Sequence, residues 1–186
     1  MRHRVFIAIN LPEKVKNNLL NFSRKWPELP VKWVRPENLH LTLEFLGYVS
    51  DGQVLEILDG AREVASRQKP FSLKLVKVCY GPPKKIPPRM IWVEGEKSEE
   101  LGFLKKNLEN CLMGFSLQKE LRVFSPHITL GRVRTFEWRR IEPEERPGVK
   151  EDISLSFEVN SIEVMESQLK RRGPEYSVLE SCPFPF

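Results

Sequence analysis

A strand-helix-strand order occurs twice along the chain of 186 residues, and this repetition constrains the fold more than any other feature. Each time, the last strand carries a motif of the same pattern, HLTL at residues 40–43 and HITL at residues 127–130. A motif that returns at the same place within the same order of elements is stronger evidence of duplication than a motif that returns alone. We therefore predict one domain, residues 1–186, made of pseudo-repeats at about residues 1–80 and 88–170.

The elements of the first repeat follow from hydrophobic periodicity. Residues 5–9 are apolar and fit a buried strand, and Pro12 fits the start of a helix. Alternation over residues 38–47 predicts a second strand, and Asp51 is placed to cap the helix that follows it. A clean alternation over residues 71–78 then predicts a third strand with one solvated face.

The second repeat begins after a proline-rich tract. The tract GPPKKIPPR, residues 81–89, cannot form a regular element because of its prolines. After it, residues 90–93 fit a strand, Ser98 can cap a helix, and residues 127–133 fit another strand. Two later alternating runs, ISLSFEV and SIEVMES, predict the last strands before a basic turn.

The composition excludes several classes of protein without choosing a function. With 40% hydrophobic and 30% charged residues, the chain is neither disordered nor membrane-spanning, and no apolar run is long enough to cross a bilayer. The net charge of +5 permits a polyanionic partner but does not require one. Three scattered cysteines without a CxxC motif fit reduced thiols, which predicts a cytoplasmic protein.

The two motifs place chemistry on strands. Residues two apart on a strand project from the same face, so His40 and Thr42 point together, as do His127 and Thr129. If the two halves pack about an approximate two-fold axis, the pairs face each other across a cleft wide enough for one phosphate. One imidazole can then take a proton while the other gives one, and the hydroxyls can donate to phosphate oxygens. This arrangement predicts phosphodiester cleavage by acid-base catalysis.

No motif for a metal or a cofactor accompanies these residues. Three distant histidines and no clustered cysteines match no zinc-ligand spacing, and carboxylate-metal phosphodiesterase motifs are missing from the sequence. A glycine-rich phosphate loop is missing too, which argues against ATP-dependent chemistry. We therefore predict no metal and no cofactor.

Several segments together resemble a known family. Besides the two HxTx motifs, these are RVFIAINLP, KWVRPENLHLTLEFLG, PRMIWV, FSPHITLGRV and GPEYSVL, which span the chain nearly from end to end. They resemble the RNA 2',3'-cyclic phosphodiesterases, also known as 2'-5' RNA ligases, of the two-histidine (2H) phosphoesterase superfamily. The resemblance implies an α+β class, with a duplicated two-lobe LigT-like fold, antiparallel sheets around a central cleft and helices outside.

The resemblance also implies an activity and the roles of individual residues. It implies hydrolysis of a 2',3'-cyclic phosphate at an RNA end to a 2'-phosphomonoester, with His40 as proton donor and His127 as proton acceptor. Thr42 and Thr129 would bind the substrate phosphate. The residue types alone do not assign the acid and the base. The partners that it implies are RNA with 2',3'-cyclic phosphate ends, including tRNA fragments, and a monomeric protein without a membrane partner.

Arg132 is a further substrate-binding candidate, because the family often carries Arg shortly after the second motif. Strand parity opposes this role, since residue 132 shares a face with Ile128 and Leu130 unless the strand ends or twists near Gly131. For the aromatic residues Phe45 and Trp33 we predict core packing rather than base stacking. For Arg89 and the basic runs we predict solvated charges, and we assign no role to His3. The runs comprise Arg132, Arg134, Arg139 and Arg140, and Lys170, Arg171 and Arg172.

Two alternative functions remain open. The same site can join a cyclic phosphate end to a 5'-hydroxyl by the reverse reaction, which would make the protein a 2'-5' RNA ligase that acts on tRNA halves. A non-enzymatic module that binds RNA ends would keep a basic groove but would not need two ionisable imidazoles. The retention of both HxTx motifs therefore favours the enzyme.

Overall fold

A nine-stranded antiparallel sheet dominates the computed structural model, which describes residues 1–115, 124–171 and 173–185. Its strands are β1 (Arg2–Asn10), β2 (Val31–Trp33), β3 (His40–Ser50), β4 (Phe71–Gly81), β5 (Met90–Gly95), β6 (His127–Val133), β7 (Lys150–Val159), β8 (Ser161–Lys170) and β9 (Gly173–Pro183). They lie in the order β7-β4-β5-β6-β3-β1-β8-β9, and β2 pairs with β6 beside this path. The predicted α+β class with antiparallel pairing is confirmed.

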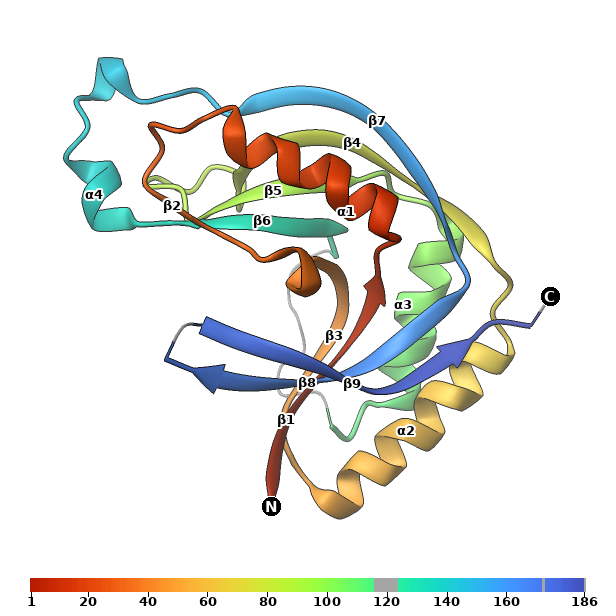
Figure 1. The fold of residues 1–186 in the computed structure, drawn as a ribbon. Helices are drawn as coiled ribbons and strands as arrows, with labels where there is room; N and C mark the ends of the chain where they lie inside the picture. The colour runs from red at the N-terminus through yellow and green to blue at the C-terminus, as the bar shows by residue number, and fades with distance from the viewer. Residues whose placement is uncertain (116–123, 172, 186) are drawn as a thin grey trace.

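Apart from β2, the sheet has two halves of four strands each, which meet at the motif-bearing strands β6 and β3. β3 and β6 share a single paired position, Leu41 with Ile128, whereas the neighbouring pairs have long ladders. Figure 1 shows β7, β4, β5 and β6 curving above, with β1, β3, β8 and β9 below. The last two strands return the chain to the half that contains β1. The boundaries of the pseudo-repeats stay a prediction.

Four α-helices occur within the described residues: α1 (Glu13–Leu20), α2 (Asp51–Ser66), α3 (Glu99–Cys111) and α4 (Thr135–Arg139). Short 3-10 helices lie at Asn21–Arg24, Pro36–Asn38 and Pro143–Glu145. The helix α2 is capped by Ser50, whose side chain accepts from the Gln53 backbone while the Gln53 side chain accepts from the Ser50 backbone. The expectation that Asp51 caps this helix is wrong, because the reciprocal capping box makes Asp51 the first helical residue.

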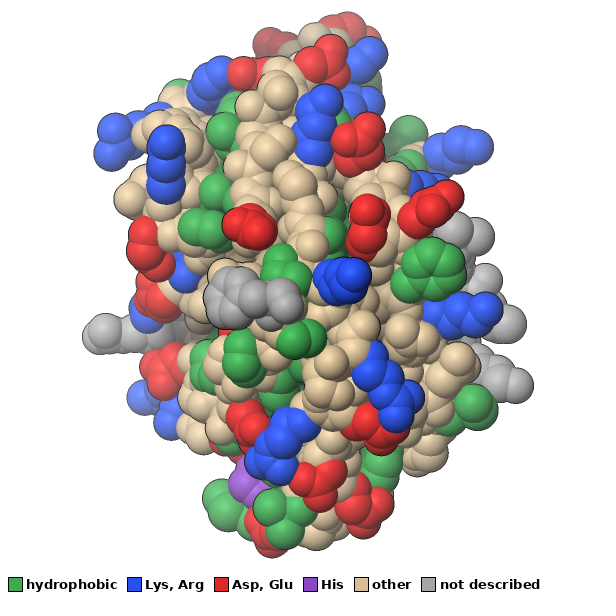
Figure 2. Space-filling view, turned by 90° about the vertical axis from the view of Figure 1, so that its right-hand side faces the viewer, with side chains coloured by type: hydrophobic (Ala, Val, Ile, Leu, Met, Phe, Trp, Pro, Cys, Tyr) green, Lys and Arg blue, Asp and Glu red, His purple; other side chains and the backbone are tan. Residues whose placement is uncertain are grey.

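The helices α2 and α3 contact each other and cover the outside of the sheet (Figure 1). Each buries one apolar stripe, such as Ile57 and Ala61 on α2 and Leu104 and Leu108 on α3. Figure 2 shows the side of the molecule that carries them, where positive and negative side chains are interspersed. A mixed-charge surface of this kind fits a solvated face rather than a track for a polyanion. In the described ranges, the helices are all too short or too polar to cross a bilayer.

Candidate active site

The pairing of β3 with β6 brings the two predicted His-Thr pairs together. Leu41 lies opposite Ile128, and the antiparallel register continued by one residue places His40 opposite Thr129 and Thr42 opposite His127. All four side chains project from the face opposite to Leu41 and Ile128, which are fully buried. The predicted pairs therefore lie side by side on adjacent strands, with an approximate two-fold relation through the Leu41–Ile128 position.

Both imidazoles are anchored in the same way. The Nδ1 atom of His40 lies 2.8 Å from the backbone oxygen of Asn38, and that of His127 lies 2.8 Å from the backbone oxygen of Ser125. A carbonyl oxygen can only accept, so each Nδ1 must carry the hydrogen that it donates. In each neutral ring, Nε2 is then the unprotonated nitrogen, able to accept a proton. When the ring is an imidazolium, the same Nε2 can donate one.

The threonines differ in their contacts. The Thr42 hydroxyl lies 3.0 Å from Nε2 of His40, to which it can donate, whereas the Thr129 hydroxyl is directed at the Met90 Sδ, 3.8 Å away. Thioether sulfur is a weak acceptor, so the Thr129 hydroxyl can turn to a better acceptor at little cost. Both threonines are half-buried, which leaves their hydroxyls accessible to a phosphate placed between the imidazoles.

Aromatic side chains surround the two histidines unequally. The His40 ring packs at 5.0 Å from Phe6 and meets Tyr176 edge-on at 5.2 Å. The His127 ring stacks on Trp92 with centroids 4.0 Å apart. Sequence reasoning did not identify these neighbours as site residues. Their signal lay in RVFIAINLP, PRMIWV and GPEYSVL, the segments that carried the family resemblance.

The environment of His40 favours its neutral form. Burial lowers the pKa of His40, the hydrogen bond to the Asn38 carbonyl opposes this shift, and the charge of His127 lowers the pKa further.

A β-bulge on β6 places Arg132 on the strand face that carries His127 and Thr129. Trp92 pairs with Thr129 and Ile91 pairs with Gly131, so the residue between them on β6, Leu130, is extra. Met90 lies two residues before Trp92 on the same face, and it pairs with Arg132. Arg132 therefore shares the face of Thr129, and the parity objection to it is wrong, because the bulge shifts the alternation by one residue.

A matching bulge on β3 brings Phe45 to the same face. Ala8 pairs with Thr42 and Ile7 with Glu44, so the residue between Thr42 and Glu44 is extra, and Phe45 pairs with Phe6. Phe45 is 58% exposed and lies 6.1 Å from the Phe6 ring. The prediction of core packing is wrong for Phe45. Phe45 and Arg132 hold corresponding positions after the two motifs.

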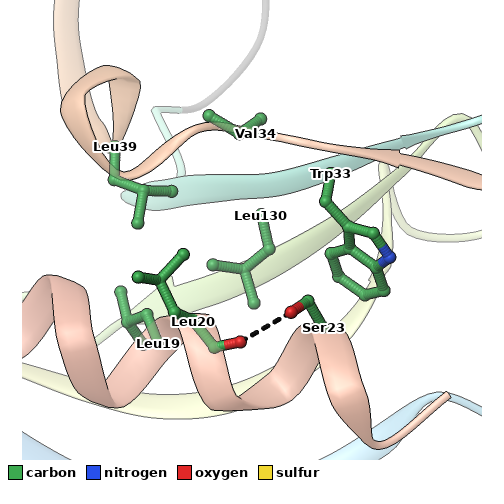
Figure 3. Close-up of a pocket in the computed structure, with 7 residues that line it drawn as sticks. All are labelled: Leu19, Leu20, Ser23, Trp33, Val34, Leu39 and Leu130. Atoms are coloured by element: carbon green, nitrogen blue, oxygen red, sulfur yellow. Dashed lines mark hydrogen bonds between the residues drawn. The ribbon is translucent and has the colours of Figure 1, made fainter. Parts of the chain in front are cut away.

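A small apolar pocket lies behind the site, between α1 and β6 (Figure 3). It is lined by Leu19, Leu20, Ser23, Trp33, Val34, Leu39 and Leu130. The hydroxyl of Ser23 donates to the Leu20 carbonyl at 2.7 Å, and the side chains that line the pocket include no ionisable group for chemistry. Trp33 packs against the main core here, as predicted.

The remaining predicted charges lie outside the paired motifs. Arg89 is exposed, as are the described members of the two basic runs, while Arg172 lies outside the described residues. His3, to which we assigned no role, bridges Asp51 and Glu166 at the far end of β1. Among the residues that the structure describes, no three His, Cys, Asp or Glu side chains gather as metal ligands would.

Comparison with known proteins identifies the family of the chain. The model of the LigT like phosphoesterase family matches residues 9–92. A Thermotoga maritima protein named RNA 2',3'-cyclic phosphodiesterase is 34% identical over 188 residues, covering 97% of this chain and 95% of the relative. A Methanocaldococcus jannaschii protein of the same name is 30% identical, covering 95% and 98%. The chain belongs to the LigT-like phosphoesterase family.

Solved structures of this family share the fold. A Thermus thermophilus protein superposes with a TM-score of 0.83 at 29% identity and 97% coverage of both chains. Escherichia coli LigT in complex with 3'-AMP superposes with a TM-score of 0.79 at 26% identity and 99% coverage of both chains. The family membership and the LigT-like fold that the resemblance implied are thus confirmed.

Proposed function

We propose that the protein is an RNA 2',3'-cyclic phosphodiesterase that converts the cyclic phosphate at an RNA end to a 2'-phosphomonoester, without a metal or cofactor. The observation that carries this proposal is the single Leu41–Ile128 pairing, which sets two His-Thr pairs side by side on adjacent strands. Two imidazoles anchored at Nδ1 leave Nε2 as the nitrogen of each ring that exchanges a proton, and they can supply both an acid and a base. The names of the relatives support the same substrate.

In the proposed reaction, His127 accepts a proton from water through Nε2 as the water attacks phosphorus. His40 donates a proton from Nε2 to the departing 3' oxygen, so the P–O3' bond breaks and the phosphate stays on O2'. Thr42 and Thr129 donate hydrogen bonds to the non-bridging oxygens, whose charge rearranges in the transition state. The guanidinium of Arg132, on the same face, pairs with the phosphate charge.

The position of the product phosphate tests this direction of cleavage. A short RNA ending in a 2',3'-cyclic phosphate is incubated with the protein in EDTA, and the product is compared with authentic 2'- and 3'-phosphates. Formation of the 2'-phosphate at the same rate with and without EDTA is the expected result. A 3'-phosphate product would reverse the assigned leaving group, and tight binding without turnover would favour the RNA-end-binding module.

The ligase alternative uses the same groups in reverse. RNA halves with a cyclic phosphate and a 5'-hydroxyl, such as tRNA halves, are the proposed test substrates at high concentration. We expect hydrolysis to prevail, because water is in large excess over any 5'-hydroxyl. A 2'-5' linkage as the main product in dilute RNA would instead favour the ligase.

We also propose a cytoplasmic monomer that acts on RNA fragments, including those of tRNA. The three cysteines Cys79, Cys111 and Cys182 are free thiols in the structure, which suits a reducing compartment. Light scattering at micromolar concentration, with an expected mass of 21.8 kDa, tests the monomeric state.

A further inference from the structure

A tryptophan lies flat against one of the two imidazoles. The planes of the Trp92 and His127 rings are inclined by 22°, and their centroids are 4.0 Å apart. Trp92 projects from β5, where it pairs with Thr129, so His127 is its diagonal neighbour on β6. Diagonal neighbours on adjacent strands lie within reach of aromatic side chains. The stack therefore follows from the strand register rather than from a chance approach of two loops.

The stack supplies a constraint that His127 otherwise lacks. A hydrogen bond from Nδ1 to the Ser125 carbonyl holds one nitrogen, but the terminal torsion of a histidine ring is broad and one bond leaves the ring free to tilt. His40 has a second polar contact at Nε2, from the Thr42 hydroxyl. The corresponding Thr129 hydroxyl is directed at Met90, so in the described residues the indole takes the place of that contact.

A glycine makes room for the indole. A methyl group at Gly81, on β4, would lie 2.1 Å from Cδ2 and 2.3 Å from Cε2 of Trp92. Separations that short do not occur, so any larger residue at this position would have to displace the ring. Gly81 on one side and His127 on the other thus fix the depth of the indole, which is only 6% exposed.

We propose that Trp92 is a positioning residue for His127: its ring plane, set by the slot at Gly81, sets the plane of the imidazole and the direction of Nε2. This role rests on the proposed function, in which His127 takes the proton from water. A small error in the direction of a catalytic group is costly, because a misplacement of about 1 Å can reduce a rate by about 10²-fold.

The structure offers a matched set of substitutions. The buried Nε1 of Trp92 has no hydrogen-bond partner among the described residues, so Trp92→Phe keeps a flat ring without breaking a hydrogen bond. Trp92→Leu removes the ring, and Gly81→Ala displaces it from the opposite side. Trp138→Leu serves as the control, since Trp138 is almost equally buried and lies on α4, away from the paired motifs.

The kinetic test compares kcat and KM for a 2',3'-cyclic nucleotide at a temperature where circular dichroism shows each variant to be folded. We expect kcat to fall about 10- to 100-fold in Trp92→Leu and Gly81→Ala, with KM changed by less than about threefold. Trp92→Phe should keep kcat within about threefold of wild type, and so should Trp138→Leu. A Trp92→Leu enzyme with the kcat of Trp138→Leu would overturn the proposal, as would a Trp92→Phe enzyme as slow as Trp92→Leu.

Nuclear magnetic resonance provides a readout that does not depend on turnover. Imidazole protons above an indole face resonate upfield, and the signals of His127 are identified by their loss in His127→Ala. We expect upfield signals in wild type and Trp92→Phe but not in Trp92→Leu. Their absence from wild type would overturn the positioning role. Upfield signals in a wild-type protein that turns over no cyclic phosphate would instead contradict the proposed function and leave the stack intact.

If Trp92→Leu does not fold, Gly81→Ala decides. Loss of the upfield signals together with an unchanged kcat in Gly81→Ala would overturn the proposal, because the stack would be gone without a kinetic effect. Loss of the upfield signals together with a lower kcat would support the proposal, because Gly81→Ala removes no group from the site.

Discussion

At the scale of the residue, the protonation of His40 is the most informative property of the site. Burial lowers its pKa and the charge of His127 lowers it further, so His40 of the free protein is mainly neutral at pH 7. A proton donor must carry its proton when the substrate is bound. A bound phosphate can restore this proton to His40, because an adjacent anion stabilises the imidazolium.

We therefore expect the pKa of His40 to lie below 6.5 in the free protein and to rise when the 2'-phosphomonoester product binds. Titration of the imidazole signals by nuclear magnetic resonance, with and without 2'-AMP, measures both values; the signals are assigned by their loss in His40→Ala. A pKa above 6.5 in the free protein would contradict the account of burial. A pKa that does not rise with the product would contradict the role of His40 as the donor.

The role that we propose for Arg132 depends on its guanidinium, which the β-bulge on β6 places on the face of Thr129. Arg132→Ala should reduce kcat/KM by about 10- to 100-fold, since hydrogen bonds to charged groups contribute about 1.5–3 kcal/mol. Arg132→Lys should recover part of this loss, because it restores the charge but not the two-pronged geometry. Arg134→Ala is the control, since Arg134 is exposed and pairs with Glu137. Equal kinetics of Arg132→Ala and Arg134→Ala would rule out the phosphate contact.

At the scale of the element, periodicity predicts what lies on one strand but not where an extra residue interrupts it. The pairs His40–Thr42 and His127–Thr129 were predictable because two residues per repeat is a property of the extended backbone. Arg132 and Phe45 were not, because each follows a bulge that reverses the faces of the strand. A bulge depends on the register with the neighbouring strand, which a single sequence does not display.

The start of α2 is tied to two strands by ionisable groups. His3 on β1 contacts Asp51 at 2.8 Å and Glu166 on β8 at 2.7 Å. The hydrogen bond to Asp51 and then that to Glu166 raise the pKa of His3, and the N-terminal amine and His3 lower the pKa of Asp51 to about 2. The raised pKa means that His3 contributes stability below pH 6.5, which is lost as the pH rises through its folded value.

The stability that Asp51 contributes depends on pH in the opposite sense. It is present above pH 3.8 and is lost as the pH falls toward 2. The pairing of His3 with Asp51 therefore stabilises the fold most between about pH 4 and 6.5. We expect His3→Gln to lower Tm more at pH 5.5 than at pH 9, as measured by scanning calorimetry. An equal decrease at both pH values would show that the charge of His3 does not contribute.

At the scale of the whole molecule, a buried ion pair joins a helix to the motif-bearing strand β3. The Lys105 ammonium on α3 contacts Glu44 on β3, and both side chains are only 6% exposed. Burial alone would lower the pKa of Lys105, but hydrogen bonds to Glu44 and Glu109 outweigh it and raise the pKa. The ammonium also lies 5.7 Å from the ring of Phe124, three residues before His127.

Lys105→Met should lower the free energy of unfolding by about 3 kcal/mol, because it removes the ammonium that contacts the buried carboxylate of Glu44. The double variant Glu44→Leu/Lys105→Met should recover most of this loss. Lys106→Met, one residue further along α3 and exposed, is the control and should change the free energy by less than about 0.5 kcal/mol. Urea denaturation measures all three values. A loss in Lys105→Met no larger than in Lys106→Met would show that the pair does not stabilise the fold.

The sequence predicted the fold class and the shared face of each His-Thr pair, but not the assembly of the two halves. The strand β4 was expected in the first repeat, yet it pairs with β5 and β7. The strands β8 and β9 return to pair beside β1 and deliver Tyr176 to His40. Such pairings join segments far apart in the chain. These strand pairings depend on which residues are buried on each face of the whole sheet, and no local sequence pattern encodes this.

The most direct test of the two-histidine site is turnover of a short RNA with a 2',3'-cyclic phosphate end, in EDTA, by wild type, His40→Ala, His127→Ala and His3→Ala. The third histidine is a matched control, because it lies at the far end of β1. We expect losses of at least about 10²-fold in His40→Ala and in His127→Ala, and near wild-type turnover in His3→Ala. Full activity of a folded His40→Ala or His127→Ala protein would contradict the account.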